Sequence, residues 1–81
     1  MKKLTLIAIE QFILENKQDI YSLDEKELPM VLADLQAEQA VMDGIEDHRN
    51  VKDISKEAFI KVFPCYWELN EVEVNTLFMN Q

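Results

Sequence analysis

Residues 27–44 read ELPMVLADLQAEQAVMDG, and they predict a long helix around which the rest of the chain is organised. Pro29 falls where a helix tolerates proline, because the first amides of a helix have no carbonyl partner inside it. Gly44 fits a left-handed cap at the other end. The helix is therefore expected to begin close to Pro29 and to end at Gly44.

This helix is expected to have two apolar sides with acids between them. One side holds Leu28, Val31, Leu32, Leu35 and Met42. The other side holds Met30, Ala33, Ala37, Ala40 and Val41, and its small residues permit close contact with another helix. The acids form a strip of Glu27, Asp34 and Glu38 and an end cluster of Asp43, Glu46 and Asp47. Acids at a helix C-terminus oppose the helix dipole, which suggests that they serve something other than helix stability.

The N-terminal segment predicts a second helix, with Thr5 as its cap. Its apolar stripe consists of Leu6, Ile9, Ile13 and Ile20, with Phe12 at the edge. Ile7 and Leu14 form a second stripe, so this helix either lies centrally in a bundle or offers one side to another molecule. A strand over residues 3–9 is the alternative, because Leu4, Leu6 and Ala8 alternate with other residues.

The remaining signals predict further helix starts and stops. Ser22 followed by Glu25 has the form of a capping box, so a helix can also begin near Leu23. After Gly44 we expect a polar connection over residues 45–53. Ser55 then caps a short helix that Pro64 ends, because the residue before a proline is biased towards extended geometry.

The last segment carries a second capping pair. Asn70 and Glu73 stand three residues apart and predict a helix that continues through Phe78. The alternative is a strand over residues 71–77, because Val72, Val74 and Thr76 alternate with polar residues.

Together these elements predict a mainly all-α fold, a compact bundle of three to four helices with a short strand at the N- or C-terminal segment as an alternative. The 81 residues form one small acidic helical domain, residues 1–81. One Gly and two Pro leave little material for tight turns. A single Cys excludes an internal disulfide, and no run approaches the roughly 20 apolar residues of a membrane span. We therefore expect a cytoplasmic protein.

The net charge of −8 comes from two windows without a base. Residues 27–48 hold six acids, residues 62–81 hold three, and the rest of the chain has seven acids against eight bases. This balance disfavours direct binding to nucleic acid or to anionic membranes, since both need clustered Lys and Arg. It favours a basic protein partner, because opposed potentials raise association rates. An acidic surface that only keeps the protein soluble is the alternative.

The sequence gives no support for an enzyme, a cofactor or a metal. His48 is the only histidine, and Ser22 and Ser55 are better explained as helix caps than as nucleophiles. Residues 47–58 resemble the skeleton of an EF-hand loop, with Ile54 at the eighth position, where a hydrophobe is expected. Its ligands are mostly missing, since Arg49 and Ala58 stand at positions three and twelve. Acyl carrier proteins are similar in size and acidity, but their Asp-Ser-Leu motif is replaced here by Tyr21-Ser22-Leu23.

The predicted partner-binding surface combines acids with aromatic anchors. It comprises Asp34, Glu38, Asp43, Glu46, Asp47, Tyr66, Trp67, Glu68 and Glu71. Aromatic residues dominate interface hot spots, and Glu68 and Glu71 would supply an acidic rim. Tyr66 and Trp67 each have an alternative as core residues, because the single Trp of a small domain is often a core plug.

These features predict a small acidic protein that binds and blocks or regulates a basic partner, such as a nucleic-acid-binding protein. Immunity proteins, antitoxins and phage-encoded inhibitors have this composition and work in this way. The alternative is a non-catalytic structural or regulatory subunit of a homo- or hetero-oligomer. In that case Ile7 and Leu14 would pack together with Val72 and Met79 in a homodimer or a larger assembly.

Overall fold

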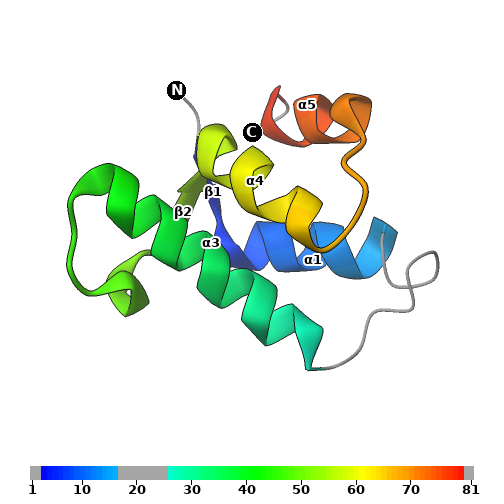
Figure 1. Cartoon of the computed structure of the whole chain (residues 1–81). Coiled ribbons are helices and arrows are strands. Elements are labelled where there is room, and N and C mark those ends of the chain that lie inside the picture. Colours follow the sequence, from blue (N-terminus) through cyan, green and yellow to red (C-terminus); the bar gives the residue numbers. More distant parts are fainter. Residues whose placement is uncertain (1–2, 17–25, 80–81) are drawn as a thin grey trace.

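The computed structural model describes residues 3–16 and 26–79, and within them the fold is mainly helical (Figure 1). The helices are α1 (Leu6–Asn16), α3 (Glu27–Asp43), α4 (Lys56–Val62) and α5 (Glu71–Met79). Two short strands, β1 (Lys3–Thr5) and β2 (Asp53–Ser55), and two 3₁₀ turns, η1 (His48–Asn50) and η2 (Phe63–Cys65), complete the order. The predicted fold class is confirmed. The predicted cap at Ser22 and the stripe position Ile20 lie outside the described residues.

The two strands form an antiparallel pair that joins the start of the chain to its middle. Leu4 faces Ile54 across the pair, and both side chains are buried. The backbone N–H of Leu6 then donates to the carbonyl of Lys52 at 3.0 Å. The two alternatives for residues 3–9 are therefore both realised in part, because the segment is extended to Thr5 and helical from Leu6.

The caps predicted from the sequence are present. Thr5 Oγ1 accepts from the N–H of Ala8 at 3.1 Å, and Ser55 Oγ accepts from the N–H of Ala58 at 3.3 Å. Gly44 has φ of 69°, the left-handed conformation that glycine adopts without steric cost, and it ends α3.

Helix α5 shows that the strand alternative for residues 71–77 is wrong. Asn70 Oδ1 accepts from the N–H groups of Val72 and Glu73 at 3.0 and 3.3 Å, so the first turn is capped. Val74 and Phe78, four residues apart, are buried, whereas Val72 is exposed. The spacing of four fixes the buried face and overrides the local alternation.

The expected polar connection over residues 45–53 is partly wrong, since it contains η1 and leads into β2. Two glutamines of α3 hold this segment. Gln36 Nε2 donates to the carbonyl of Val51 at 2.8 Å, and the buried Gln39 Oε1 accepts from the N–H of Ser55 at 2.8 Å. The strand depends on this distant anchor and on β1, which is why local sequence did not indicate it.

The core is built around aromatic rings. Phe59 stacks on Phe63 with ring centroids 4.8 Å apart, and Phe12 and Phe78 meet Phe59 edge-on. Trp67 tilts against Phe63 at 5.3 Å. Such pairs contribute about 0.5–1.5 kcal/mol each beyond the area they bury.

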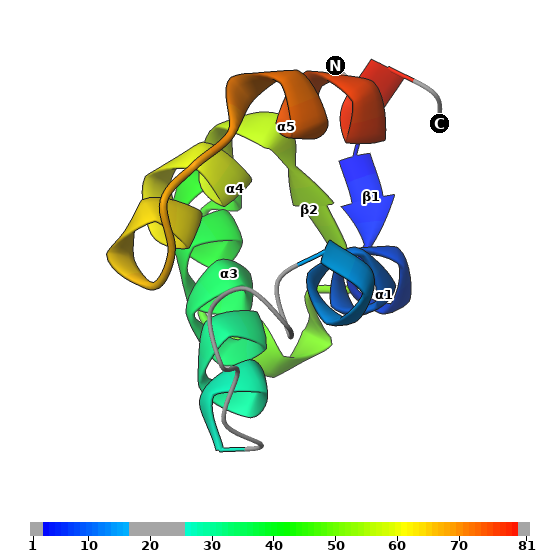
Figure 2. The same ribbon diagram turned by 90° about the vertical axis from the view of Figure 1, so that its right-hand side faces the viewer.

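In both ribbon views α4 lies between α3 and α5, and α3 and α1 lie on opposite sides in the rotated view (Figure 2). The expected first side of α3 faces inward, with Val31 and Leu35 buried, except at its C-terminal end, where Met42 is 38% exposed. The second side faces outward, with Met30 58% and Val41 76% exposed, and of its members Ala40 alone is buried. No helix in the described part of the chain has the length and apolar character needed to cross a bilayer.

Candidate partner-binding surface

The predicted binding residues do not form one surface, and the geometry of α3 explains the division. Successive helical residues are about 100° apart, so Asp34 and Glu38 lie on one side of α3 and Asp43 lies on the opposite side. The strip and the end cluster are therefore separate features.

Two acids of the strip, Asp34 and Glu38, line an open groove between α3 and the α4–η2 segment. The groove has a volume of about 330 Å³. Its lining comes from both sides, Asp34, Ala37, Glu38 and Val41 from α3 and Lys61, Val62 and Cys65 from α4 and η2. Small and apolar residues thus alternate with carboxylates along one edge.

Tyr66 is joined to the middle acid of this strip by a direct hydrogen bond. Its hydroxyl donates to Asp34 Oδ2. This bond, partial burial and the negative charges of Asp34, Cys65 and Glu27 together raise the pKa of Tyr66 to about 12. Tyr66 is half-buried, so the predicted anchor is a partly exposed ring fixed by an acid of the strip.

Glu38 is paired with a base from α4, outside the base-free residues 27–48. Lys61 Nζ lies 3.4 Å from Glu38 Oε1, with both side chains partly exposed. Such exposed pairs contribute between nothing and about 1 kcal/mol, and their charges stay accessible to solvent and to other ions.

Two of the three acids in the end cluster are engaged with neighbouring residues of the fold. Asp43 accepts from Gln39 Nε2 at 3.0 Å and lies 3.4 Å from Lys3 Nζ. Asp47 caps η1 by accepting from the N–H of Arg49 at 3.0 Å, and Arg49 Nε donates to the same oxygen at 3.1 Å. These bonds to Arg49 hold the pKa of Asp47 below its usual range. Glu46 is exposed beside them.

Trp67 is a core residue in the structure, which resolves its two alternatives. Only 5% of it is exposed, and its ring packs against Phe63. The interpretation of Trp67 as a surface anchor is therefore corrected, because its indole is buried between the rings of Phe63 and Tyr66, with centroids 5.3 and 5.9 Å away. Glu68 in the following connection is exposed.

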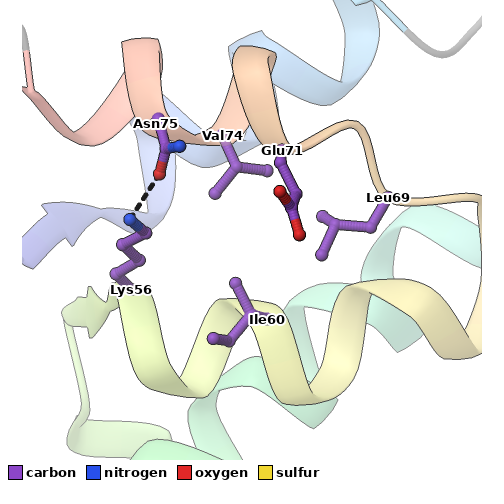
Figure 3. Close-up of a pocket in the computed structure, with 6 residues that line it drawn as sticks. All are labelled: Lys56, Ile60, Leu69, Glu71, Val74 and Asn75. Atoms are coloured by element: carbon purple, nitrogen blue, oxygen red, sulfur yellow. Dashed lines mark hydrogen bonds between the residues drawn. The ribbon is translucent and has the colours of Figure 1, made fainter.

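Glu71 lies at a different hollow, between α4 and α5. The hollow has a volume of about 310 Å³ (Figure 3). Its lining comprises Lys56, Ile60, Leu69, Glu71, Val74 and Asn75. Lys56 Nζ donates to Asn75 Oδ1 across one side, while Ile60, Leu69 and Val74 form an apolar part. The volume is at the lower limit of small-ligand sites, which typically span about 300–1,000 Å³.

The sequence could not show that distant bases approach the acidic helix. Lys3 and Lys61 reach Asp43 and Glu38 from 40 and 23 residues away. A window without bases in sequence is therefore not free of bases in space.

No three His, Cys, Asp or Glu side chains gather in a metal-binding arrangement within residues 3–16 and 26–79. Comparisons with protein-family models, with curated proteins and with solved structures gave no match to this chain. The function is therefore argued from the surface alone.

Proposed function

We propose that the protein binds a basic protein partner and blocks or regulates it, in the way of an immunity protein, an antitoxin or a phage-encoded inhibitor, and that it does so in the cytoplasm. The docking surface is the outward side of α3 with the α3–α4 groove. The acids of the strip hold cationic side chains of the partner, and the apolar residues between them exclude water from the contact.

One observation carries this proposal: a large apolar side chain stands in solvent beside two carboxylates. Val41 is 76% exposed and lines the groove together with Glu38 and Asp34. Burying an exposed Val completely contributes about 1.5–3 kcal/mol, which is worth about one to two orders of magnitude in affinity. A surface that served solubility alone would gain nothing from this residue.

The charge supports a basic partner over nucleic acid. The chain carries 16 acids against eight bases. Three of the bases, Lys3, Arg49 and Lys61, already lie within 3.4 Å of a carboxylate. A phosphate backbone needs several cations on one face.

The test uses the immobilised protein as bait for the host's own lysate. The double variant Asp34→Lys with Glu38→Lys is compared with Glu10→Lys with Glu15→Lys, which makes the same change in net charge on α1. We expect the wild type and the α1 variant to retain a basic protein that the α3 variant loses. We also expect the affinity for that protein to fall steeply between about 50 and 200 mM salt. Equal retention by all three baits, or binding indifferent to salt, would contradict the proposal.

A second candidate function has support from a different surface. Ile7, Val72 and Met79 are exposed by 70%, 73% and 74%, and Leu14 by 37%. These are the residues expected to pack in a homodimer or a larger assembly. Sedimentation velocity tests this: a dimer that Val72→Glu with Met79→Glu abolishes, and that persists at high salt, favours the subunit over the inhibitor.

A further inference from the structure

We infer that the segment recognised on α3 is an amphipathic helix of the partner, with an apolar seam and a basic flank on one side. This inference rests on the proposed function and specifies the occupant of the same surface.

The outward side of α3 has the spacing of a helix-packing seam. Met30, Ala37 and Val41 follow at intervals of seven and four residues, and they fall within about 40° of one another around the axis. Met30 and Val41 are 58% and 76% exposed, at the two ends of the seam. The small side chain of Ala37 lies between them and lets a partner backbone approach closely.

The acids run parallel to this seam at the same intervals. Glu27, Asp34 and Glu38 are also separated by seven and four residues, and they lie about 60° round the helix from the seam. Tyr66 identifies the direction of this flank, because its hydroxyl donates to Asp34, and Glu38 lies beside Lys61 of α4. The flank therefore faces η2 and the groove, and the other edge of the seam carries no acid at these intervals until Asp43.

A partner of matching shape is a helix with the same two intervals. The seam from Met30 to Val41 covers about 16 Å, or three turns, which is the length of an average helix. A helix laid along α3 would place apolar residues on Met30, Ala37 and Val41 and place Lys or Arg, at spacings of seven and four, on Glu27, Asp34 and Glu38. At Asp34 such a cation would share the carboxylate with the Tyr66 hydroxyl, and at Glu38 it would compete with the exposed Lys61.

Charge excludes the simplest other occupants. A second copy docked antiparallel through the same side would bring two acidic strips together, and like charges across an interface cost several kcal/mol. A parallel copy would offer the strip no base from its own α3, since residues 27–48 contain no Lys or Arg. An anionic membrane would be repelled by the same three carboxylates. The partner helix must therefore carry its basic residues on the side that covers the acidic strip of α3.

The test uses two fluorescent peptides of about 18 residues built from Leu, Lys and Ala. In the first peptide, Leu residues at spacings of seven and four form the apolar seam, and Lys residues at the same spacings form the basic flank. The second peptide has the same composition in scrambled order. Two variants of the full chain are compared, Val41→Glu on the seam and Val72→Glu on α5, where the wild-type side chains are 76% and 73% exposed. Both variants add the same negative charge, and circular dichroism melts verify that both fold.

We expect the helical peptide to bind the wild type and the Val72→Glu variant alike, and to lose at least about tenfold in affinity with Val41→Glu. A purely electrostatic contact gives the opposite result, because an added carboxylate would bind a Lys-rich peptide as well or better. Equal affinity for the scrambled peptide would also overturn the helix, as would no binding of either peptide up to about 1 mM, the weakest affinity that such an assay resolves. Each of these results would refute the helical partner segment but not the proposed function. The proposed function would still be supported if the wild type retained a basic protein that the Asp34→Lys, Glu38→Lys variant did not.

Discussion

Replacing Gln39 by Met should be among the most damaging single changes on α3, although it preserves side-chain length. Gln39 is buried, with a relative exposure of 2%, and its side chain makes two hydrogen bonds. Its Oε1 accepts from the N–H of Ser55 at 2.8 Å, and its Nε2 donates to Asp43 Oδ1 at 3.0 Å. The thioether of Met can form neither hydrogen bond. The N–H of Ser55, the residue that joins β2 to α4, therefore becomes a buried donor without this partner.

The magnitude follows from these two contacts. A buried backbone donor left unsatisfied costs about 1–3 kcal/mol, and the bond to Asp43 contributes roughly another 0.5–1.5 kcal/mol. We therefore expect a loss of about 2–4 kcal/mol, which lowers the melting temperature of a domain this small by roughly 10–25 °C. Since a domain of this length has a total stability of about 4–12 kcal/mol, the variant should be close to the limit of folding.

The assay is urea unfolding followed by circular dichroism, with two matched controls. Gln36→Met removes one donor to the carbonyl of Val51 in a partly buried position and should cost about 0.5–1.5 kcal/mol. Gln11→Met changes an exposed residue of α1 and should stay within about 0.5 kcal/mol of wild type. A Gln39→Met variant as stable as Gln11→Met would refute the reasoning that this amide ties α3 to β2 and α4.

Three further changes test other parts of the structure. In a Tyr21→Phe background, absorbance titration should show Tyr66 ionising at about 12 instead of 10.0, and Asp34→Asn should bring it down. Folding raises this pKa, so the Tyr66–Asp34 hydrogen bond contributes its full stability below pH 10. That contribution is lost as the pH rises from 10 to 12. The Tyr66→Phe variant lacks the bond, so its melting temperature should not show this decrease between pH 10 and 12. Gly44→Ala should lower the free energy of unfolding, measured in urea, by about 1–2 kcal/mol. The whole loss comes from the left-handed backbone, because a Cβ at this position meets nothing within 4 Å. Gly44→Asn should lower it less, since Asn adopts this conformation more readily. Ser55→Ala should cost about 1 kcal/mol, since the N–H of Ala58 loses its cap, and Ser55→Asp should restore most of it; an unchanged unfolding midpoint in Ser55→Ala would show that the cap contributes nothing.

The elements that could be predicted are those with a local cause. Thr5, Gly44, Ser55 and Asn70 each satisfy or end a helix within a few residues of themselves, so their roles could be inferred from spacing alone. The strand at residues 53–55 could not, because it exists through pairing with β1 and through the bond from Gln39.

The binding surface was predictable in part for the same reason. The helical wheel separated the inward side of α3 from the outward side with Met30 and Val41, but it misplaced Ala40, which is buried, and Met42, which is exposed. It could not show that Lys61 approaches Glu38, because ion pairs between helices depend on how the helices pack. Nor could composition decide that Trp67 belongs to the core, because its burial depends on packing against Phe63.

The contact between Leu4 and Ile54 has a consequence for the order in which the chain assembles. These residues are fifty positions apart, so their pairing encloses more than half of the chain. Closing so long a loop costs about 3–4 kcal/mol of chain entropy, whereas each helix forms from neighbours. The helices should therefore assemble before the strands join, and the strand pair should be the first part to open. Amide hydrogen exchange in β1 would then proceed while α3 and α4 are still protected, and a protein shortened at its start would present β2 as an open edge to other chains.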